Sequence, residues 1–263
     1  MQPERFEMIY WYKDQIYDNQ PFLAPSISVQ RADGVFESIL TKESFAFLLD
    51  RHFKRMHEAG LKLGIETIPE KQIQSAILKL LSANKFTGFG RLRINYFSDA
   101  QFYLSLEPTE LNDESAKLTI YPFVRYSKSL MSGIKSTSYA ESAAAVRFAQ
   151  QRKFTDSLII NELDQVVETG FSSFIYRLND QWFTPTRQSG CLPGIIREVL
   201  IEKKIIQEQD LLKSNLSSID SAAVLSSIRL IQLVKTIEQR DFSHANDDLE
   251  FLRTTRELLL SSK

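Results

Sequence analysis

The stretch WFTPTRQSGCLPGIIR, residues 182–197, joins an expected strand to an expected helix through a turn rich in glycine and proline. Pro193 and Gly194 stand directly before the helical pattern, so the backbone amides of Ile195 and Ile196 have no partner inside the helix. These amides lie at the positive end of the helix dipole, where an anion binds well. The stretch therefore predicts an anion site, although a Pro-Gly pair is also an ordinary way to begin a helix.

Helices and strands alternate on both sides of this stretch. The turn of one expected hairpin falls on Asn179-Asp180, a pair suited to the left-handed backbone of a two-residue turn. Apolar periodicity predicts the other elements of the second half. These are a helix over residues 139–154, a strand, turn and strand over 156–169, the hairpin over 172–185, and helices over 194–205 and 246–260.

The first half has the same mixture of elements. Apolar side chains that recur at three and four residues predict helices, and apolar side chains that alternate with polar ones predict half-buried strands. The expected helices cover residues 44–63 and 68–85, and the expected strands cover 8–17 (with a turn), 34–40, 90–98, 101–108 and 117–123. Three strands in a row after two helices indicate an antiparallel or mixed sheet with helices on one side.

These patterns predict an α+β protein of two α/β domains. The irregular segment VRYSKSLMSG, after which the pattern starts afresh, is the expected joint. We expect a smaller first domain over residues 1–124, a linker over 125–132 and a larger second domain over 133–263. Small-molecule sites often form in the cleft between two domains.

The composition narrows the possible functions. The chain has 263 residues, of which 43% are hydrophobic and 25% are charged, values that are ordinary for a globular protein. Its formal net charge of -1 gives no electrostatic reason to expect nucleic acid or an anionic membrane as a partner. A single cysteine and three histidines without paired spacing predict no metal site. We expect a cytoplasmic protein, because no apolar run approaches the length of a membrane span.

Three charged residues stand in settings that need an explanation. Lys135 lies among glycine and small hydroxyl residues in SGIKSTSY, just past the expected joint, where it is either an ordinary loop lysine or a cleft residue. Arg55 follows Leu48 by seven residues and shares its helix stripe, so it needs an anion, which a salt bridge at the helix edge would also supply. Glu168 interrupts an apolar strand and needs a cation unless that strand face is exposed.

Taken together, these groups describe one ligand. An aldehyde would suit the amine, an anion would suit the arginine and the helix start, and a basic ring nitrogen would suit the carboxylate. Pyridoxal phosphate has all three groups.

The order of several segments resembles the fold-type IV, class IV aminotransferase family. The segments that carry the resemblance are DGVFES, RHFKRM, GIKSTSY, VVETGFSSF, WFTPTRQSGCLPGIIR and VLSSIRLI, from about residue 33 to residue 234. The family includes branched-chain and D-amino acid aminotransferases and aminodeoxychorismate lyase. The resemblance implies two α/β domains with the cofactor between them, and a homodimer.

The resemblance also implies roles for individual residues. Lys135 would be the Schiff-base lysine, and Glu168 would be the partner of the pyridine nitrogen. Arg55 and the amides of Ile195 and Ile196 would hold the phosphate, with Ser226 and Ser227 near the cofactor. Among the departures of the chain from the family pattern, Gly170 and Ser173 replace a common serine and a common asparagine.

The reaction stays open between two alternatives within this family. The compact length resembles aminodeoxychorismate lyase, which eliminates pyruvate from aminodeoxychorismate and leaves 4-aminobenzoate. An aminotransferase would instead pass the amino group to a keto acid. A third alternative is a cofactor-binding protein without turnover. Arg91 and Arg93 share one face of an expected strand and are candidates to hold a substrate carboxylate, unless that face is solvated.

Overall fold

The computed structural model describes residues 8–18, 26–65, 68–111, 114–243 and 246–261. The chain divides into two compact units that are not consecutive in sequence. Of the described residues, unit 1 contains those up to Leu111 and Ile134–Ser138, and unit 2 contains those of 114–133 and those from Tyr139 onward. Both units combine helices with a sheet, which confirms the α+β class.

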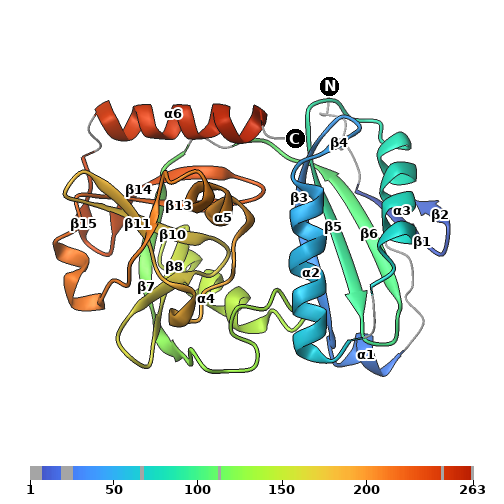
Figure 1. Cartoon of the computed structure of the whole chain (residues 1–263), viewed down its shortest axis with the longest axis horizontal. Helices are drawn as coiled ribbons and strands as arrows, with labels where there is room; N and C mark the ends of the chain where they lie inside the picture. Colours follow the sequence, from blue (N-terminus) through green and yellow to red (C-terminus); the bar gives the residue numbers. More distant parts are fainter. Residues whose placement is uncertain (1–7, 19–25, 66–67, 112–113, 244–245, 262–263) are drawn as a thin grey trace. The chain divides into compact units, whose positions relative to one another are not determined.

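Unit 1 is built on an antiparallel sheet that has six strands within the described residues, in the order β2-β1-β6-β5-β3-β4. Helices α2 and α3 pack against this sheet, whose apolar side chains form one core with theirs (Figure 1). The strands are β1 (Ile9–Tyr12), β2 (Gln15–Tyr17), β3 (Gly34–Lys42), β4 (Phe45–Ala46), β5 (Phe89–Phe97) and β6 (Phe102–Pro108). The helices are α1 (Ile27–Gln30), α2 (Leu49–Leu63) and α3 (Glu70–Ser82).

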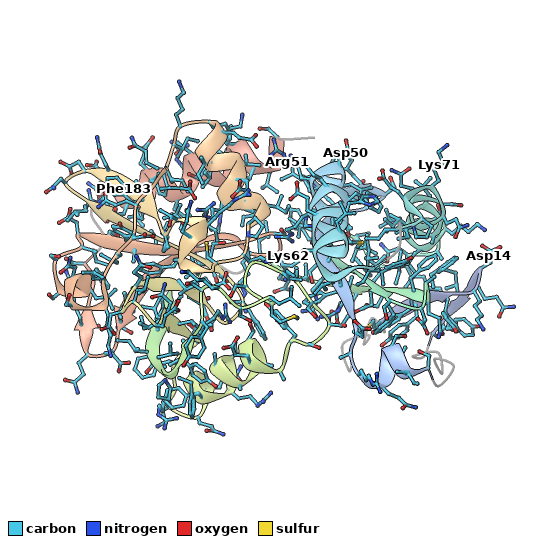
Figure 2. The ribbon with its side chains drawn as sticks, turned by 60° about the horizontal axis from the view of Figure 1, so that its bottom comes forward. Asp14, Asp50, Arg51, Lys62, Lys71 and Phe183 are labelled. Atoms are coloured by element: carbon cyan, nitrogen blue, oxygen red, sulfur yellow. The ribbon has the colours of Figure 1, made fainter. Side chains whose placement is uncertain are left out.

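The β1–β2 hairpin of unit 1 turns at Lys13 and Asp14. Both residues have left-handed backbones, with φ angles of 46° and 64°, as a two-residue hairpin turn requires. Asp14, labelled in Figure 2, lies at this turn, and its carboxylate forms an ion pair with Lys79 of α3 (Glu70–Ser82).

The helix expected from Ser44 begins later, at Leu49. Phe45 and Ala46 pair with β3 as the short strand β4, and Leu48 has a left-handed backbone with φ of 52°. The apolar residues before Leu49 therefore have helical spacing in the sequence, but their backbone is not helical.

The segment Ile134–Ser138 returns to unit 1 and runs beside the edge of β3. The amide of Phe36 donates to the carbonyl of Lys135 at 2.9 Å, and the amide of Thr137 donates to the carbonyl of Gly34 at 2.9 Å. A Cβ atom at Gly34 would lie 2.3 Å from the carbonyl oxygen of Tyr96, so only glycine allows the strands to approach this closely. Lys135 is therefore fixed to β3 by its backbone.

Unit 2 is built on a mixed sheet that has nine strands within the described residues. Their order is β12-β11-β10-β13-β14-β7-β8-β9, with β15 beside β14. The strands are β7 (Ala116–Arg125), β8 (Asp156–Asn161), β9 (Val166–Thr169), β10 (Ser173–Leu178), β11 (Gln181–Thr184), β12 (Gln207–Glu208), β13 (Ser221–Ser226), β14 (Leu230–Ile237) and β15 (Arg240–Asp241). Strand β7 pairs in parallel with both β8 and β14.

Helices also pack on the strands of unit 2 (Figure 1). Helix α4 (Ala140–Gln150) contacts β7 and β8, α5 (Ile195–Glu202) contacts β13, and α6 (Asn246–Ser261) contacts β14. Two short 3₁₀ helices cover Arg187–Ser189 and Lys213–Ser217. Within the described part of the chain, no helix has the length and apolar character to cross a membrane.

The division into units differs from the expected domains at two places. Strand β7 was expected in the first domain, but its partners β8 and β14 place it in unit 2. The expected linker, residues 125–132, lies in unit 2, whereas Ile134–Ser138 lies in unit 1. The physical reason is that both neighbours of β7 come later in the sequence, so its own local pattern does not reveal its sheet.

Candidate functional site

The amine of Lys135 lies over an aromatic ring in unit 1. Its Nζ atom is 4.4 Å from the centre of the Phe36 ring, and the side chain is half-buried. The guanidinium carbon of Arg93 lies 3.9 Å from the centre of the same ring. One aromatic ring therefore holds both an amine and a guanidinium by cation–π contacts.

Arg93 is held further by its neighbours on the sheet. Its Nε atom donates to Oδ1 of Asn95 at 3.1 Å. Asn95 is 2% exposed, and its Nδ2 atom makes no hydrogen bond to any described residue. Burial raises the pKa of Tyr103, while the charge of Arg93 acts in the opposite direction. Arg91, in contrast, forms an ion pair with Glu107 and is half-exposed.

Arg55 belongs to a buried ionic cluster with Glu37 and His52. Its Nε atom donates to Oε1 of Glu37 at 2.8 Å, its Nη2 atom donates to Oε2 at 2.5 Å, and Nδ1 of His52 lies 2.6 Å from the same Oε2. Glu37 is 1% exposed. Burial alone would raise the pKa of Glu37, but Arg55 and His52 outweigh it and lower this pKa to about 2.

The cluster extends electrostatically toward Lys135. Burial lowers the pKa of His52, and although Glu37 opposes this effect, the charges of Arg55 and Lys135 reinforce it. His52 is therefore neutral near pH 7, and Arg55 carries the positive charge that balances Glu37.

Glu168, in unit 2, is 8% exposed, and its two carboxylate oxygens have different partners. Nη1 of Arg125 donates to Oε1, and the amide of Leu192 donates to Oε2 at 3.0 Å. The cation that this buried carboxylate was expected to need is thus Arg125. Because Leu192 belongs to the GCLPG turn, the carboxylate also fixes the segment that leads into α5.

Asp156 anchors the turn after Glu168. Its carboxylate accepts hydrogen bonds from Thr169 Oγ1 at 2.8 Å, from the amide of Gly170 at 3.0 Å and from the amide of Phe171 at 3.1 Å. A Cβ atom at Gly170 would lie 2.7 Å from Oδ1 of Asp156 and 2.7 Å from Cγ2 of Val146. Close packing therefore explains why residue 170 is glycine and not the serine that is common in the family.

The start of α5 has the character predicted from its sequence. Gly194 is its N-cap residue, and no side chain caps this end of the helix. A Cβ atom at Gly194 would lie 2.4 Å from Oγ of Ser173. The second departure from the family pattern, Ser173, thus packs directly against the residue that opens the helix.

Ser226 and Ser227 lie close to this helix start along the sheet. Ser173 pairs with Leu225, the residue before Ser226, in the β10–β13 ladder. Ser226 Oγ accepts a hydrogen bond from the amide of Arg229 at 3.1 Å, and both serines are half-buried.

Tyr139 and Cys191 complete the surroundings of Glu168. Burial and the charge of Glu168 raise the pKa of Tyr139 to about 12 and that of Cys191 to about 11. The Tyr139 hydroxyl donates to the carbonyl of Gly170 at 3.3 Å, and its ring stacks on Phe171. Both groups are therefore neutral near pH 7.

The donor groups fit pyridoxal phosphate. A carboxylate has about four acceptor positions, and the bonds that Glu168 makes to Arg125 and Leu192 leave capacity for a ring N–H. The uncapped helix start supplies backbone amides to an anion, and the close approach of Gly194 to Ser173 leaves no space for a Cβ at this point. A guanidinium has five N–H donors, so Arg55 can bind both Glu37 and an anion.

The site residues predicted from the sequence are divided between the two units. Lys135, Arg55, Arg91 and Arg93 lie in unit 1, and Glu168, Ile195, Ile196, Ser226 and Ser227 lie in unit 2. Sequence reasoning did not single out Phe36, Glu37, His52, Arg125 or Asp156. The signal for Glu37 and Arg125 was indirect, since Arg55 and Glu168 each required a partner of opposite charge.

Comparison with known proteins identifies the family. The family model for class IV amino-transferases matches residues 34–237. A protein of Schizosaccharomyces pombe named "Putative aminodeoxychorismate lyase" is 25% identical over 205 residues, which cover 75% of this chain and 87% of that protein. The aminodeoxychorismate lyase of Bacillus subtilis is 28% identical over 186 residues, which cover 64% of each protein.

Solved structures share the fold at lower identity. A branched-chain aminotransferase of Thermoproteus uzoniensis, crystallised with norvaline, has a TM-score of 0.86 at 21% identity and covers 97% of this chain and 96% of its own. A structure from Legionella pneumophila, named "Putative 4-amino-4-deoxychorismate lyase", has a TM-score of 0.79 at 21% identity, covering 90% and 96%. The matched family model spans most of the chain, which therefore belongs to the class IV amino-transferase family of enzymes that use pyridoxal 5′-phosphate.

Proposed function

We propose that this enzyme is a 4-amino-4-deoxychorismate lyase, which eliminates pyruvate from its substrate and leaves 4-aminobenzoate for folate synthesis. The observation that carries the proposal is the pair of cations on the Phe36 ring, where the Lys135 amine and the Arg93 guanidinium contact the same aromatic ring. This pair suits a small substrate with an amino group and a carboxylate. The names of the two curated relatives favour the lyase reaction.

The cofactor-binding residues follow from the donor groups and from the family resemblance. Lys135 would bind the aldehyde, and Glu168 would accept a hydrogen bond from the protonated ring nitrogen. Arg55 and the amides of Ile195 and Ile196 would hold the phosphate. Ser226 and Ser227 would lie nearby and supply hydroxyl groups.

The amine of Lys135 would move the protons of the reaction. When bound, the cofactor supplies an electron sink for the carbanion that forms when the substrate loses a proton. Once the substrate amine has replaced it at the aldehyde, the freed Lys135 amine would take the proton from the ring carbon that bears the amino group, and it would later protonate the departing enolpyruvyl group. Contact with the Phe36 ring holds the amine beside β3.

Arg93 is the stronger candidate for binding a substrate carboxylate. Its guanidinium is held by Phe36 and Asn95, so little conformational freedom is lost when a carboxylate binds. The buried Nδ2 of Asn95 would supply a second donor to the same carboxylate. Arg91 is engaged by Glu107, and its role in substrate binding remains the weaker proposal.

An aminotransferase of the branched-chain or D-amino acid type is the alternative reaction, because the same lysine could move the same proton and pass the amino group to a keto acid. Incubation of the loaded enzyme with aminodeoxychorismate, without any keto acid, separates the two reactions. We expect catalytic formation of 4-aminobenzoate, retained in Lys128→Ala and lost in Lys135→Ala. Turnover that requires both an amino donor and a keto acceptor would instead establish the aminotransferase.

A protein that binds the cofactor without turnover is the third alternative. It would show the absorption of the bound cofactor, sensitive to Lys135→Ala, and would convert neither substrate class. The intact set of Lys135, Glu168 and Arg55 supports an active enzyme.

We further propose that the enzyme is a cytoplasmic homodimer. Support for the dimer comes from apolar side chains that are exposed at the end of β7 and in the loop after it. These are Phe123, Val124, Tyr126, Leu130 and Met131. Sedimentation equilibrium should give a mass close to twice 30.3 kDa, and a monomer at micromolar concentration would contradict the dimer.

A further inference from the structure

Arg125 is buried beneath Glu168 and holds it at the end of β7. It is 9% exposed, and its Nη1 atom donates to Oε1 of Glu168. The two other branches of the guanidinium are also engaged, because Nε donates to Glu141 at 3.0 Å and Nη2 donates to Ser142 Oγ at 3.3 Å. The guanidinium plane is therefore fixed by contacts to three side chains.

These contacts come from different elements of unit 2. Arg125 is the last residue of β7, Glu141 and Ser142 lie in the first turn of α4, and Glu168 lies on β9. Burial alone would lower the pKa of Arg125, but the charges of Glu168 and Glu141 outweigh it and raise this pKa. The guanidinium is therefore charged near pH 7.

We infer that Arg125 is a positioning residue for the cofactor ring. It fixes the Glu168 carboxylate in its ionised form, so that this carboxylate can accept a charge-assisted hydrogen bond from the ring nitrogen. This inference rests on the proposed role of Glu168.

The physical reason is the burial of Glu168. An unpaired carboxyl group in such a setting favours its neutral form, because burial penalises the charge. A neutral carboxyl group would accept a much weaker hydrogen bond from a protonated ring nitrogen. Arg125 supplies the compensating charge from one side of the carboxylate, and the amide of Leu192 directs the other oxygen. The ring nitrogen then meets a carboxylate that is already charged and oriented.

The inference is tested by comparing two ligands. One ligand is pyridoxal 5′-phosphate, and the other is its analogue in which a C–H group replaces the ring nitrogen. Both carry the same aldehyde and phosphate, so the ratio of their dissociation constants isolates the nitrogen. Binding to the apoprotein is followed by quenching of tryptophan fluorescence. A general loss of structure would weaken both ligands and leave the ratio unchanged.

We expect the wild type to bind pyridoxal phosphate about 10- to 100-fold more tightly than the analogue, as a hydrogen bond to a charged group implies. Arg125→Met should reduce this preference to within about threefold, by the same reasoning. Arg125→Lys should restore most of it, because the charge returns. Arg147→Met, at an exposed position of α4, is the matched control and should keep the wild-type ratio.

Arg125→Gln provides a second variant if methionine prevents folding, since an amide can still donate to Glu168 without carrying a charge. Its preference should fall in the same way. If Arg125→Met or Arg125→Gln folds and keeps the wild-type ratio, the inference is wrong. If the wild type shows no preference, or Glu168→Gln keeps it, the proposed role of Glu168 fails as well. The two failures are thus distinguishable.

Discussion

Replacing Glu37 with glutamine removes the charge at the centre of the buried cluster of unit 1. The carboxylate accepts two hydrogen bonds from Arg55 and contacts His52, with only 1% of the residue exposed. Its pKa of about 2, against an ordinary value of 4.5, corresponds to about 3 kcal/mol of stability. Breaking a buried pair costs roughly 3–5 kcal/mol in general, so both routes give a similar magnitude.

Urea unfolding at about pH 8, where His52 is neutral, measures this loss. We expect Glu37→Gln to lower the free energy of unfolding by about 3–5 kcal/mol, because Arg55 remains buried without its counter-charge. Glu70→Gln, at a half-exposed residue that pairs with His57, is the matched control and should lose less than about 1 kcal/mol.

The same substitution predicts a pH dependence with a definite sign. The folded pKa of Glu37 is lowered, so its contribution is complete above about pH 5 and is lost as the pH falls toward about 2. We would measure the effect of Glu37→Gln in a His52→Asn background, because the lowered pKa of His52 makes the imidazole titrate in acid as well. The advantage of glutamate over glutamine should shrink by about 1–2 kcal/mol between about pH 5 and pH 3. A loss below about 1 kcal/mol at pH 8, or an advantage that grows in acid, would refute this reasoning.

Three further substitutions test the site. Lys135→Ala should abolish turnover but leave the melting temperature nearly unchanged, because the bonds that fix this segment to β3 come from the backbone; a collapse of the fold would contradict this. Gly194→Ala should lower the free energy of unfolding by about 1–3 kcal/mol and weaken cofactor binding, because the new Cβ meets Ser173 Oγ. Adding Ser173→Gly to the same chain removes this contact and should recover both properties. Gly170→Ser should cost at least as much in a thermal melt, because its Cβ would meet Asp156 and Val146; a stable variant would show that the turn can relax.

Local patterns predicted most of the secondary structure. The Asn179-Asp180 turn is confirmed by φ angles of 52° and 60° at these residues. Strands β13 and β14 were not predicted as such, although part of their sequence carries the family resemblance. Their segments SAAVLS and LIQLV are buried on both faces and do not alternate, so periodicity cannot distinguish them from a buried helix.

The sequence also predicted which residues need partners, but not which partners they have. Arg55 required an anion, and the structure supplies Glu37, 18 residues earlier on β3. Glu168 required a cation, and the structure supplies Arg125, 43 residues earlier on β7. Both pairs form across a sheet or between a helix and a sheet, where sequence separation carries no information about distance. The expected domain boundary differs from the division into units for the same reason, because the partners of β7 are distant in sequence.

The central claim is that Lys135 forms the bond to the cofactor aldehyde. Borohydride reduction of the loaded protein makes such a bond permanent, and mass spectrometry of its peptides then locates the pyridoxyl phosphate group. We predict that the group is found on Lys135 and that prior substitution Lys135→Ala abolishes it. Labelling of a different lysine in the wild type, or no labelling at saturating cofactor, would contradict the claim.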